Sequence, residues 1–355
     1  MDVALKIWRY DPETGERELK LYQVEAPEWA CLLDVLDIVK DQVDGTLAYR
    51  KSCRMMICGS CGMRMDGRAV LACKERMKPI ADRGHVPVIS AMGNMPVLKD
   101  LVVDMHPFWT KIKAMKPWLD TGYEELPEQE FRISQEAMNP IHKEALCIMC
   151  GCCVSECNSM ESDPEFFGPA ALAKGFRFVG DPRDRAGVER LERYNDEHGI
   201  WDCTRCYFCN ERCPKGVDPR DAIAKLGAES IRVGIDRDMG AKHAKWFVHS
   251  AKTTGWLRET ELVPKTQGVL GALKETKFAL SLLRHGKVPI LPHVADDVGE
   301  ARALYELVRA QGRDGAAGIV QGERALARIE HTDAGSARRD APEITPSEPT
   351  PHAEG

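Results

Sequence analysis

Apolar and polar positions alternate along much of the first third of the chain, with the two-residue period of a β-strand. The runs ALKIWRY and ERELKLYQVEA follow this period, and DPETG between them has the Asp, Pro and Gly of a turn. From about Trp29 to Gln42 the apolar residues instead recur at helical intervals. MRMDGRAVLAC predicts a hairpin that turns at Asp66-Gly67, and HVPVISAM predicts another strand. We therefore expect residues 1–105 to form a strand-rich domain with one helix.

Helical periodicity dominates the rest of the chain. GPAALAKGFRFV places Pro169 where a first helical turn tolerates it, and DPRDAIAKLGAESIRV repeats the pattern, so we expect a helical domain over residues 106–235. HAKWFVHSAKTTGW, VLGALKETKFALSLLRHG and ARALYELVRAQG predict helices in an extension, residues 236–330, which GKVPILP interrupts. Residues 331–355 are rich in Pro and charge, and we expect them to be disordered.

Composition narrows the class of protein. The formal net charge of -6 gives no basic footprint for nucleic acid. The chain shows no charged-then-apolar leader, and no apolar run approaches the ~20 residues of a membrane span. We therefore expect any membrane contact to come through partner subunits. Fourteen cysteines without such a leader favour a reducing cytoplasm over a disulfide framework.

Eight of these cysteines form two runs with the same C-x2-C-x2-C-x3-C spacing, and Pro214 follows the second run. This is the bacterial ferredoxin spacing, in which the fourth cysteine of each run ligates the cluster of the other run. Zinc also suits thiolate tetrads, but its sites usually consist of two separate C-x2-C pairs. The spacing predicts a [4Fe–4S] cluster on one tetrad and a further cluster on the other. The tetrads are Cys147, Cys150, Cys153 and Cys213, and Cys203, Cys206, Cys209 and Cys157.

An upstream group has the C-x4-C-x2-C spacing of plant-type ferredoxins, followed by a more distant fourth cysteine. Gly59 and Gly62 within it suit a loop that closes tightly over a [2Fe–2S] cluster and donates N–H groups to its sulfurs. With the surrounding strands this loop implies a β-grasp ferredoxin domain. Two cysteines remain: we expect Cys31 to be buried on the first helix and Cys152 to pack under a cluster. The four predicted ligands are Cys53, Cys58, Cys61 and Cys73.

Four segments resemble the iron–sulfur subunit of succinate dehydrogenase and fumarate reductase: YRKSCRMMICGSCGMRMDG, CIMCGCC, PEFFGPAALAKGFRFVGDPRD and CNERCPKGVDP. The resemblance covers roughly residues 1–235. It implies an α+β protein in which the β-grasp domain precedes an all-α, two-cubane ferredoxin domain. It also implies an electron carrier between an FAD subunit with the dicarboxylate site and a quinone-linked membrane partner. This chain would then lie peripherally at the cytoplasmic face of the inner membrane and hold no catalytic residues itself.

The chain departs from the family pattern at its second cysteine run. The family lacks the second cysteine of this run and holds a [3Fe–4S] cluster, whereas this chain has Cys206. We therefore predict [4Fe–4S] as the third cluster, or [3Fe–4S] if Cys206 is idle. A lower potential would follow, which suits menaquinone. The stretch Asn158 to Ser162 lacks the family's quinone-pocket Trp, and Thr204 replaces its His. The quinone-linked partner is then either a membrane anchor or a cysteine-rich subunit related to heterodisulfide reductases.

Other functions remain open at this point. The alternative within the same redox class is the iron–sulfur subunit of another flavoprotein complex, of the thiol-driven fumarate reductase, glycolate dehydrogenase or glycerol-3-phosphate dehydrogenase type. The plant-type domain and the stretch FGPAALAKGFRF favour the dicarboxylate complex. A zinc-stabilised interaction module is the alternative from a different class. Basic residues near the first group either attract the flavoprotein or solvate a loop, and three histidines without ligand-like spacing are expected to be structural. These residues are Lys51, Arg54, Arg64 and Arg68, and His85, His106 and His142.

Overall fold

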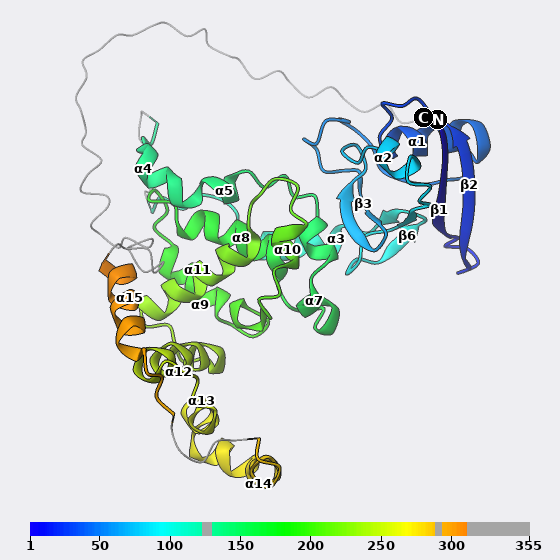
Figure 1. Ribbon diagram of the computed structural model, residues 1–355. Helices are drawn as coiled ribbons and strands as arrows, with labels where there is room; N and C mark the ends of the chain where they lie inside the picture. The colour runs from blue at the N-terminus through cyan, green and yellow to red at the C-terminus, as the bar shows by residue number, and fades with distance from the viewer. Residues whose placement is uncertain (123–129, 288–292, 311–355) are drawn as a thin grey trace, which may run out of the picture.

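The computed structural model describes residues 1–122, 130–287 and 293–310. The N-terminal unit is a mixed five-stranded sheet with the order β2-β1-β5-β3-β4. Its strands are β1 (Asp2–Tyr10), β2 (Arg17–Glu25), β3 (Gly62–Met65), β4 (Arg68–Leu71) and β5 (Val88–Ser90). β1 pairs antiparallel with β2 and parallel with β5, and β3 pairs antiparallel with both β4 and β5. The sheet, followed by a helical region, confirms the predicted α+β class (Figure 1).

The turn between β3 and β4 lies where the sequence placed it. Asp66 and Gly67 have φ angles of 51° and 75°. A two-residue hairpin turn that matches the strand twist needs positive φ at both positions, which Asp and Gly tolerate. His85 supports the turn, because its Nε2 lies 2.8 Å from Asp66 Oδ2.

The first helix begins later than the apolar pattern indicated. α1 (Leu32–Ile38) continues into a π-helical turn, η1 (Val39–Val43). Trp29 is 65% exposed and stands outside the helix, and Cys31 is the half-buried N-cap with its Sγ 2.9 Å from Asp34 Oδ2. The prediction of a buried, mid-helix Cys31 was therefore wrong. Asp34 also accepts the Cys31 N–H, so a cap starts the helix where periodicity alone could not locate it.

The helical unit packs around a second core. Its helices are α3 (His106–Ala114), α4 (Gln135–Met138), α5 (His142–Ala145), α6 (Cys152–Ser155), α7 (Asn158–Ser162), α8 (Gly168–Val179), α9 (Gly187–Tyr194), α10 (Phe208–Glu211) and α11 (Pro219–Arg232), with 3-10 turns η2 (Asn139–Ile141) and η3 (Ile200–Asp202). Phe166, Phe176 and Tyr194 are fully buried between them. A short helix α2 (Lys78–Ala81) and the pair β6 (Val97–Lys99) and β7 (Val102–Val103) precede this unit. The short helices therefore surround the cysteine runs, and the two longest helices of this unit, α8 and α11, pack behind them.

The extension leads away from the helical unit on the side opposite the sheet (Figure 1). It contains α12 (Met239–Thr254), α13 (Glu259–Lys274), α14 (Thr276–Arg284) and α15 (Val298–Ala310). α13 consists of two helical segments that meet at Gly268, whose φ is 76°. The last part of the expected connector, the last part of the extension and the expected disordered tail, residues 288–292, 311–330 and 331–355, lie outside the described residues. Among the helices that are described, none has the length and apolar character needed to cross a membrane.

Candidate iron–sulfur sites

The upstream cysteine group lies on a loop that leads into β3. Three backbone N–H groups point at Cys53 Sγ, from Met55, Ile57 and Cys58, at 3.4, 3.3 and 3.2 Å. The loop also has positive φ at Arg54, Met56 and Gly59, three residues with different side chains. Positive φ in a turn directs successive N–H groups into one concavity, the arrangement that binds anions and Fe–S groups.

The thiols of this loop suit a metal cluster chemically. Burial acts to raise the pKa of Cys58, but hydrogen bonds from Ser60 and Cys53 outweigh it and lower the value to about 6. Cys61 and Cys73 lie together at the base of the β3–β4 hairpin, where burial raises the pKa of Cys61 to about 12. A buried thiol of this kind becomes a thiolate when a metal replaces its proton. The four side chains therefore fit a cluster with two exposed-side and two core-side ligands.

The two downstream runs share one backbone conformation. Met149 and Arg205, each two residues after the first cysteine, have φ of 54° and 56°. Gly151 and Tyr207, each directly after the second cysteine, have φ of 81° and 67°. A short helix then carries the third cysteine of each run, α6 with Cys153 in the first and α10 with Cys209 in the second. Cys206 thus occupies in its loop the position that Cys150 occupies in the other.

The fold brings the fourth cysteine of each run to the other run. Cys147, Cys150, Cys153 and Cys213 line one small cavity between α6, α8 and the start of α11. In the second set, burial first and then the neighbouring thiols of Cys203 and Cys157 raise the pKa of Cys209 to about 12. Burial also raises the pKa of Cys157, and the thiols of Cys203 and Cys206 add to this effect. None of the fourteen cysteines, all within the described residues, forms a disulfide.

Cys152 lies beside a predicted cluster ligand, as expected, because a hydrogen bond from its thiol lowers the pKa of Cys150 to about 7. It is fully buried, and its neighbours belong to the core of the N-terminal unit, with Met63 and Leu71. It therefore joins the two units instead of packing only under a cluster. The first cysteine run touches the N-terminal unit at a second point, because a Cβ on Gly59 would lie 2.7 Å from Cys150 Cβ.

Arg64 links the two units and was not recognisable as a link from the sequence. Its Nε donates to Glu156 Oε1 at 2.7 Å, and its Nη2 donates to the Ser155 carbonyl. A Cβ on Gly93 would overlap the Arg64 guanidinium, so glycine leaves the path that this side chain needs. Asn94 adds a second link, because its Nδ2 donates to the carbonyls of Val154 and Cys157 at 2.8 and 2.9 Å. Arg64 therefore has a structural role within the chain, and Lys51 and Arg54 pair with Asp37 of α1.

Comparison with known proteins agrees with these sites. Residues 4–110 match the family model of the 2Fe-2S iron-sulfur cluster binding domain, and residues 145–217 match that of the 4Fe-4S dicluster domain. The fumarate reductase iron-sulfur subunit of Haemophilus influenzae is 37% identical over 241 residues, which are 64% of this chain and 93% of that protein. This chain belongs to the iron–sulfur subunit family of fumarate reductases and succinate dehydrogenases.

Two further relatives of the family extend the comparison. The 8-methylmenaquinol:fumarate reductase iron-sulfur subunit of Wolinella succinogenes is 32% identical over 285 residues, which are 79% of this chain and 89% of that protein. A share of 79% corresponds to more residues than the 235 that precede the extension, so the similarity reaches into the extension. In solved structures, a chain of the Mycobacterium smegmatis Sdh1 complex in the apo form matches with a TM-score of 0.59 and 28% identity. The match covers 66% of this chain and 98% of that chain.

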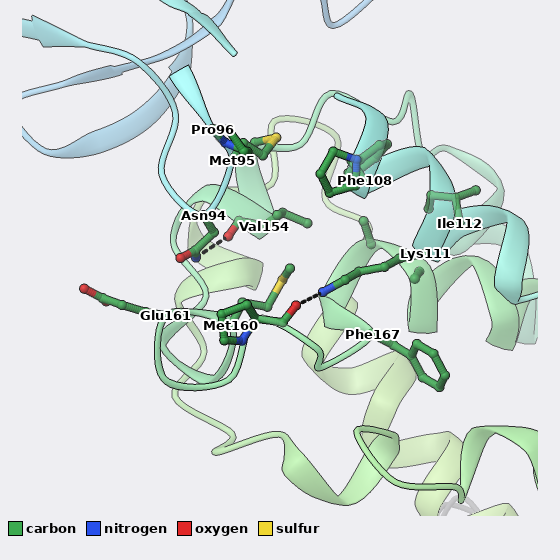
Figure 2. A pocket seen from close by; sticks show the side chains of 14 residues that line it. Asn94, Met95, Pro96, Phe108, Lys111, Ile112, Val154, Met160, Glu161 and Phe167 are labelled. Carbon is green, nitrogen blue, oxygen red and sulfur yellow. Dashed lines mark hydrogen bonds between the residues drawn. The ribbon is translucent and has the colours of Figure 1, made fainter. Parts of the chain in front are cut away.

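A cavity of about 460 Å³ lies between α3, α7 and α8 (Figure 2). Met95, Phe108 and Met160 give it an apolar lining, and Asn94 at its edge bonds the Cys157 carbonyl. Lys111 contributes an ammonium group that donates to the Phe166 carbonyl at 2.6 Å, and burial lowers its pKa. Glu161 of α7 stands on the rim (Figure 2), in the stretch where the sequence lacks the family's Trp. The cavity therefore combines an apolar wall with two polar groups close to one cluster position.

Proposed function

We propose that this chain is the electron-transfer subunit of a complex that interconverts succinate and fumarate and exchanges the electrons with a quinone. The observation that carries the proposal is the assembly of three thiol sets in a chain of this family, with no disulfide among them. The clusters, when bound, supply one-electron chemistry. The residues of this chain hold them, fix their spacing and shield them from water. A partner subunit holds FAD and the dicarboxylate site.

The assignment of ligands follows the grouping of the thiols. Cys53, Cys58, Cys61 and Cys73 hold [2Fe–2S] in a β-grasp domain of plant ferredoxin type. Cys147, Cys150, Cys153 and Cys213 hold [4Fe–4S] in a two-cubane ferredoxin domain, which is supported by the cavity that all four line. Cys157, Cys203, Cys206 and Cys209 hold the third cluster, which we infer to be [4Fe–4S]. The matching backbone of the two runs supports this nuclearity, because it gives Cys206 the place that Cys150 has.

We also propose menaquinone as the quinone, at an interface with a membrane anchor or a cysteine-rich quinone-linked subunit. The Wolinella succinogenes relative acts on 8-methylmenaquinol by name. The apolar cavity beside Cys157 supports access of an apolar ring to that end of the chain. The complex would lie at the cytoplasmic face of the inner membrane.

Electron paramagnetic resonance with an iron count tests the proposal. The complex is purified anaerobically and measured before and after reduction with dithionite. We expect a reduced [2Fe–2S] signal, no [3Fe–4S] signal in the oxidised sample, and about ten irons per chain, as two, four and four. About nine irons with a strong oxidised [3Fe–4S] signal would show that Cys206 is idle. A colourless zinc protein would overturn the whole assignment.

The companion subunit distinguishes the competing flavoproteins. A co-purified FAD subunit that oxidises succinate or reduces fumarate supports the proposal. A companion that oxidises glycolate or glycerol 3-phosphate, and leaves succinate and fumarate unchanged, contradicts it. The relatives from Haemophilus influenzae and Wolinella succinogenes are fumarate reductase subunits by name, which favours the dicarboxylate complex.

A further inference from the structure

Within the part of the chain that the structure describes, the tip of the helical extension has few packing contacts. α14 has no buried residue, and its apolar side chains follow one face at helical spacing, as Phe278 and Leu282, and Ala279 and Leu283. Phe278 is 63% exposed, and Leu270 and Leu273 on the adjoining part of α13 are 78% and 64% exposed. We call this set, with Leu283, the tip surface. A helix of nine residues is marginal in water unless it buries an apolar face. The tip surface therefore needs a covering.

The charge around the tip surface indicates what covers it. Residues 239–287 contain nine lysines and arginines against three glutamates, a net charge of +6 in a chain whose formal net charge is -6. Lys274, Lys277 and Arg284 flank the apolar residues and form no ion pair within the described residues. Apolar residues interleaved with uncompensated basic ones are typical of helices that lie in an anionic lipid interface. Protein interfaces are instead depleted in lysine at their centre.

We propose that the tip surface of α13 and α14 inserts into the headgroup region of an anionic membrane. The chain then contacts the lipid directly, in addition to any contact through partner subunits. The position of the tip agrees with this, because α14 lies at the end of the molecule far from the sheet that carries the first cysteine group (Figure 1). Phe278 and the leucines bury apolar surface, and the basic side chains lie at the level of the lipid phosphates.

Vesicle flotation of the full, cluster-loaded chain tests the proposal. The chain is mixed with vesicles of phosphatidylcholine, or of equal parts phosphatidylcholine and phosphatidylglycerol. We expect binding to the anionic vesicles that weakens as salt is added, and little binding to the neutral ones. The double variant K277Q/R284Q should bind about 25-fold more weakly, since each basic residue near an anionic surface contributes about 1 kcal/mol, a factor of about 5. F278S/L283S should lose binding by at least about tenfold.

Matched variants at the other end of the molecule serve as controls. K6Q/K99Q removes the same charge from two exposed lysines of the N-terminal unit and should bind like the parent chain. Cluster content measured from visible absorbance shows that each variant is folded, which is expected because α14 buries no residue. Equal binding by K277Q/R284Q and K6Q/K99Q would overturn the proposal. The proposal would also fail if the parent chain did not bind vesicles and F278S/L283S did not assemble with a partner subunit. The tip surface would then be a protein interface.

Discussion

The two cysteine runs of this chain have the same spacing and the same backbone torsions, yet their surroundings differ. The first run lies against the N-terminal unit, where Cys152 enters the core and Gly59 touches Cys150. The second run faces outward, with Cys206 exposed and Tyr207 47% exposed. Local sequence therefore sets the shape of each loop, and tertiary packing sets what each loop can contact. The enclosed run suits an internal carrier, and the open run suits one that meets a partner subunit.

Substitution of the matched cysteines gives the sharpest contrast. Cys150→Ala should remove a ligand from the site that lies against the N-terminal unit, so that the second cluster is lost and at most about six irons remain. Cys206→Ala should leave three ligands, and the third cluster should survive as [3Fe–4S] with about nine irons in total. Iron analysis and electron paramagnetic resonance of the oxidised proteins measure both outcomes.

The reverse result would break the comparison. If Cys206→Ala leaves the iron content and the spectra of the parent chain unchanged, the two loops share a backbone but not a role. Cys152→Ser is the control for the first run, since Cys152 is not one of the predicted ligands and serine keeps a hydrogen-bond donor beside Cys150. It should keep the full iron content and lower only thermal stability.

The sequence predicted those features that short stretches of chain determine. Asp66-Gly67 indicated a hairpin, because a tight turn depends on local backbone geometry. The approach of Cys213 to the first run is not local, and it was predicted only because the ferredoxin spacing carries it. The sequence did not predict the packing of Cys152 in the N-terminal core or the path of Arg64 past Gly93, because these depend on contacts between residues far apart in the chain. Periodicity also missed the cap at Cys31, where a side-chain hydrogen bond starts the helix.

Two glycines with positive φ separate packing from backbone strain. Gly59 has φ of 72° and lies against Cys150, whereas Gly216, after the second run, has φ of 63° and nothing within 4 Å of an added Cβ. Gly59→Ala should cost about 2–5 kcal/mol, from the left-handed backbone and from overpacking against Cys150. Gly216→Ala should cost only the backbone part, about 1–2 kcal/mol. Thermal unfolding under anaerobic conditions compares the stability of the two variants. Equal losses of stability would show that the contact between Gly59 and Cys150 adjusts to an added methyl group without a further energetic cost.

The arginine beside each run offers a weaker test of the same contrast. Arg64→Gln removes the charged hydrogen bonds to Glu156 and to the Ser155 carbonyl and should cost about 1.5–3 kcal/mol. The guanidinium of Arg220 lies 4.3 Å from the centre of the exposed Tyr207 ring. Arg220→Gln should therefore lower the free energy of unfolding by only about 0.5–1 kcal/mol. Both losses are measured as shifts in thermal midpoint. A larger loss for Arg220→Gln would mean that the second run is held as firmly as the first.

The smallest expected effect is a pH dependence confined to the second run. His198, five residues before Cys203, places its Nδ1 2.7 Å from Asp163 Oδ2, and this hydrogen bond raises the pKa of His198 above its ordinary 6.5. A raised pKa in the folded state means that the pair stabilises fully below about pH 6.5 and that the contribution fades as pH rises through the raised value. The same pair lowers the pKa of Asp163, so the contribution also fades in strong acid, as pH falls through that lowered value.

The difference in thermal midpoint between the parent chain and His198→Gln should therefore be larger near pH 5.5 than near pH 8. Arg64→Gln at the first run removes no histidine, so the corresponding difference in thermal midpoint should not follow the same curve. A difference for His198→Gln that stays constant with pH would show that the imidazole acts only through its neutral form. The second run would then be held, like the first, by contacts that do not titrate.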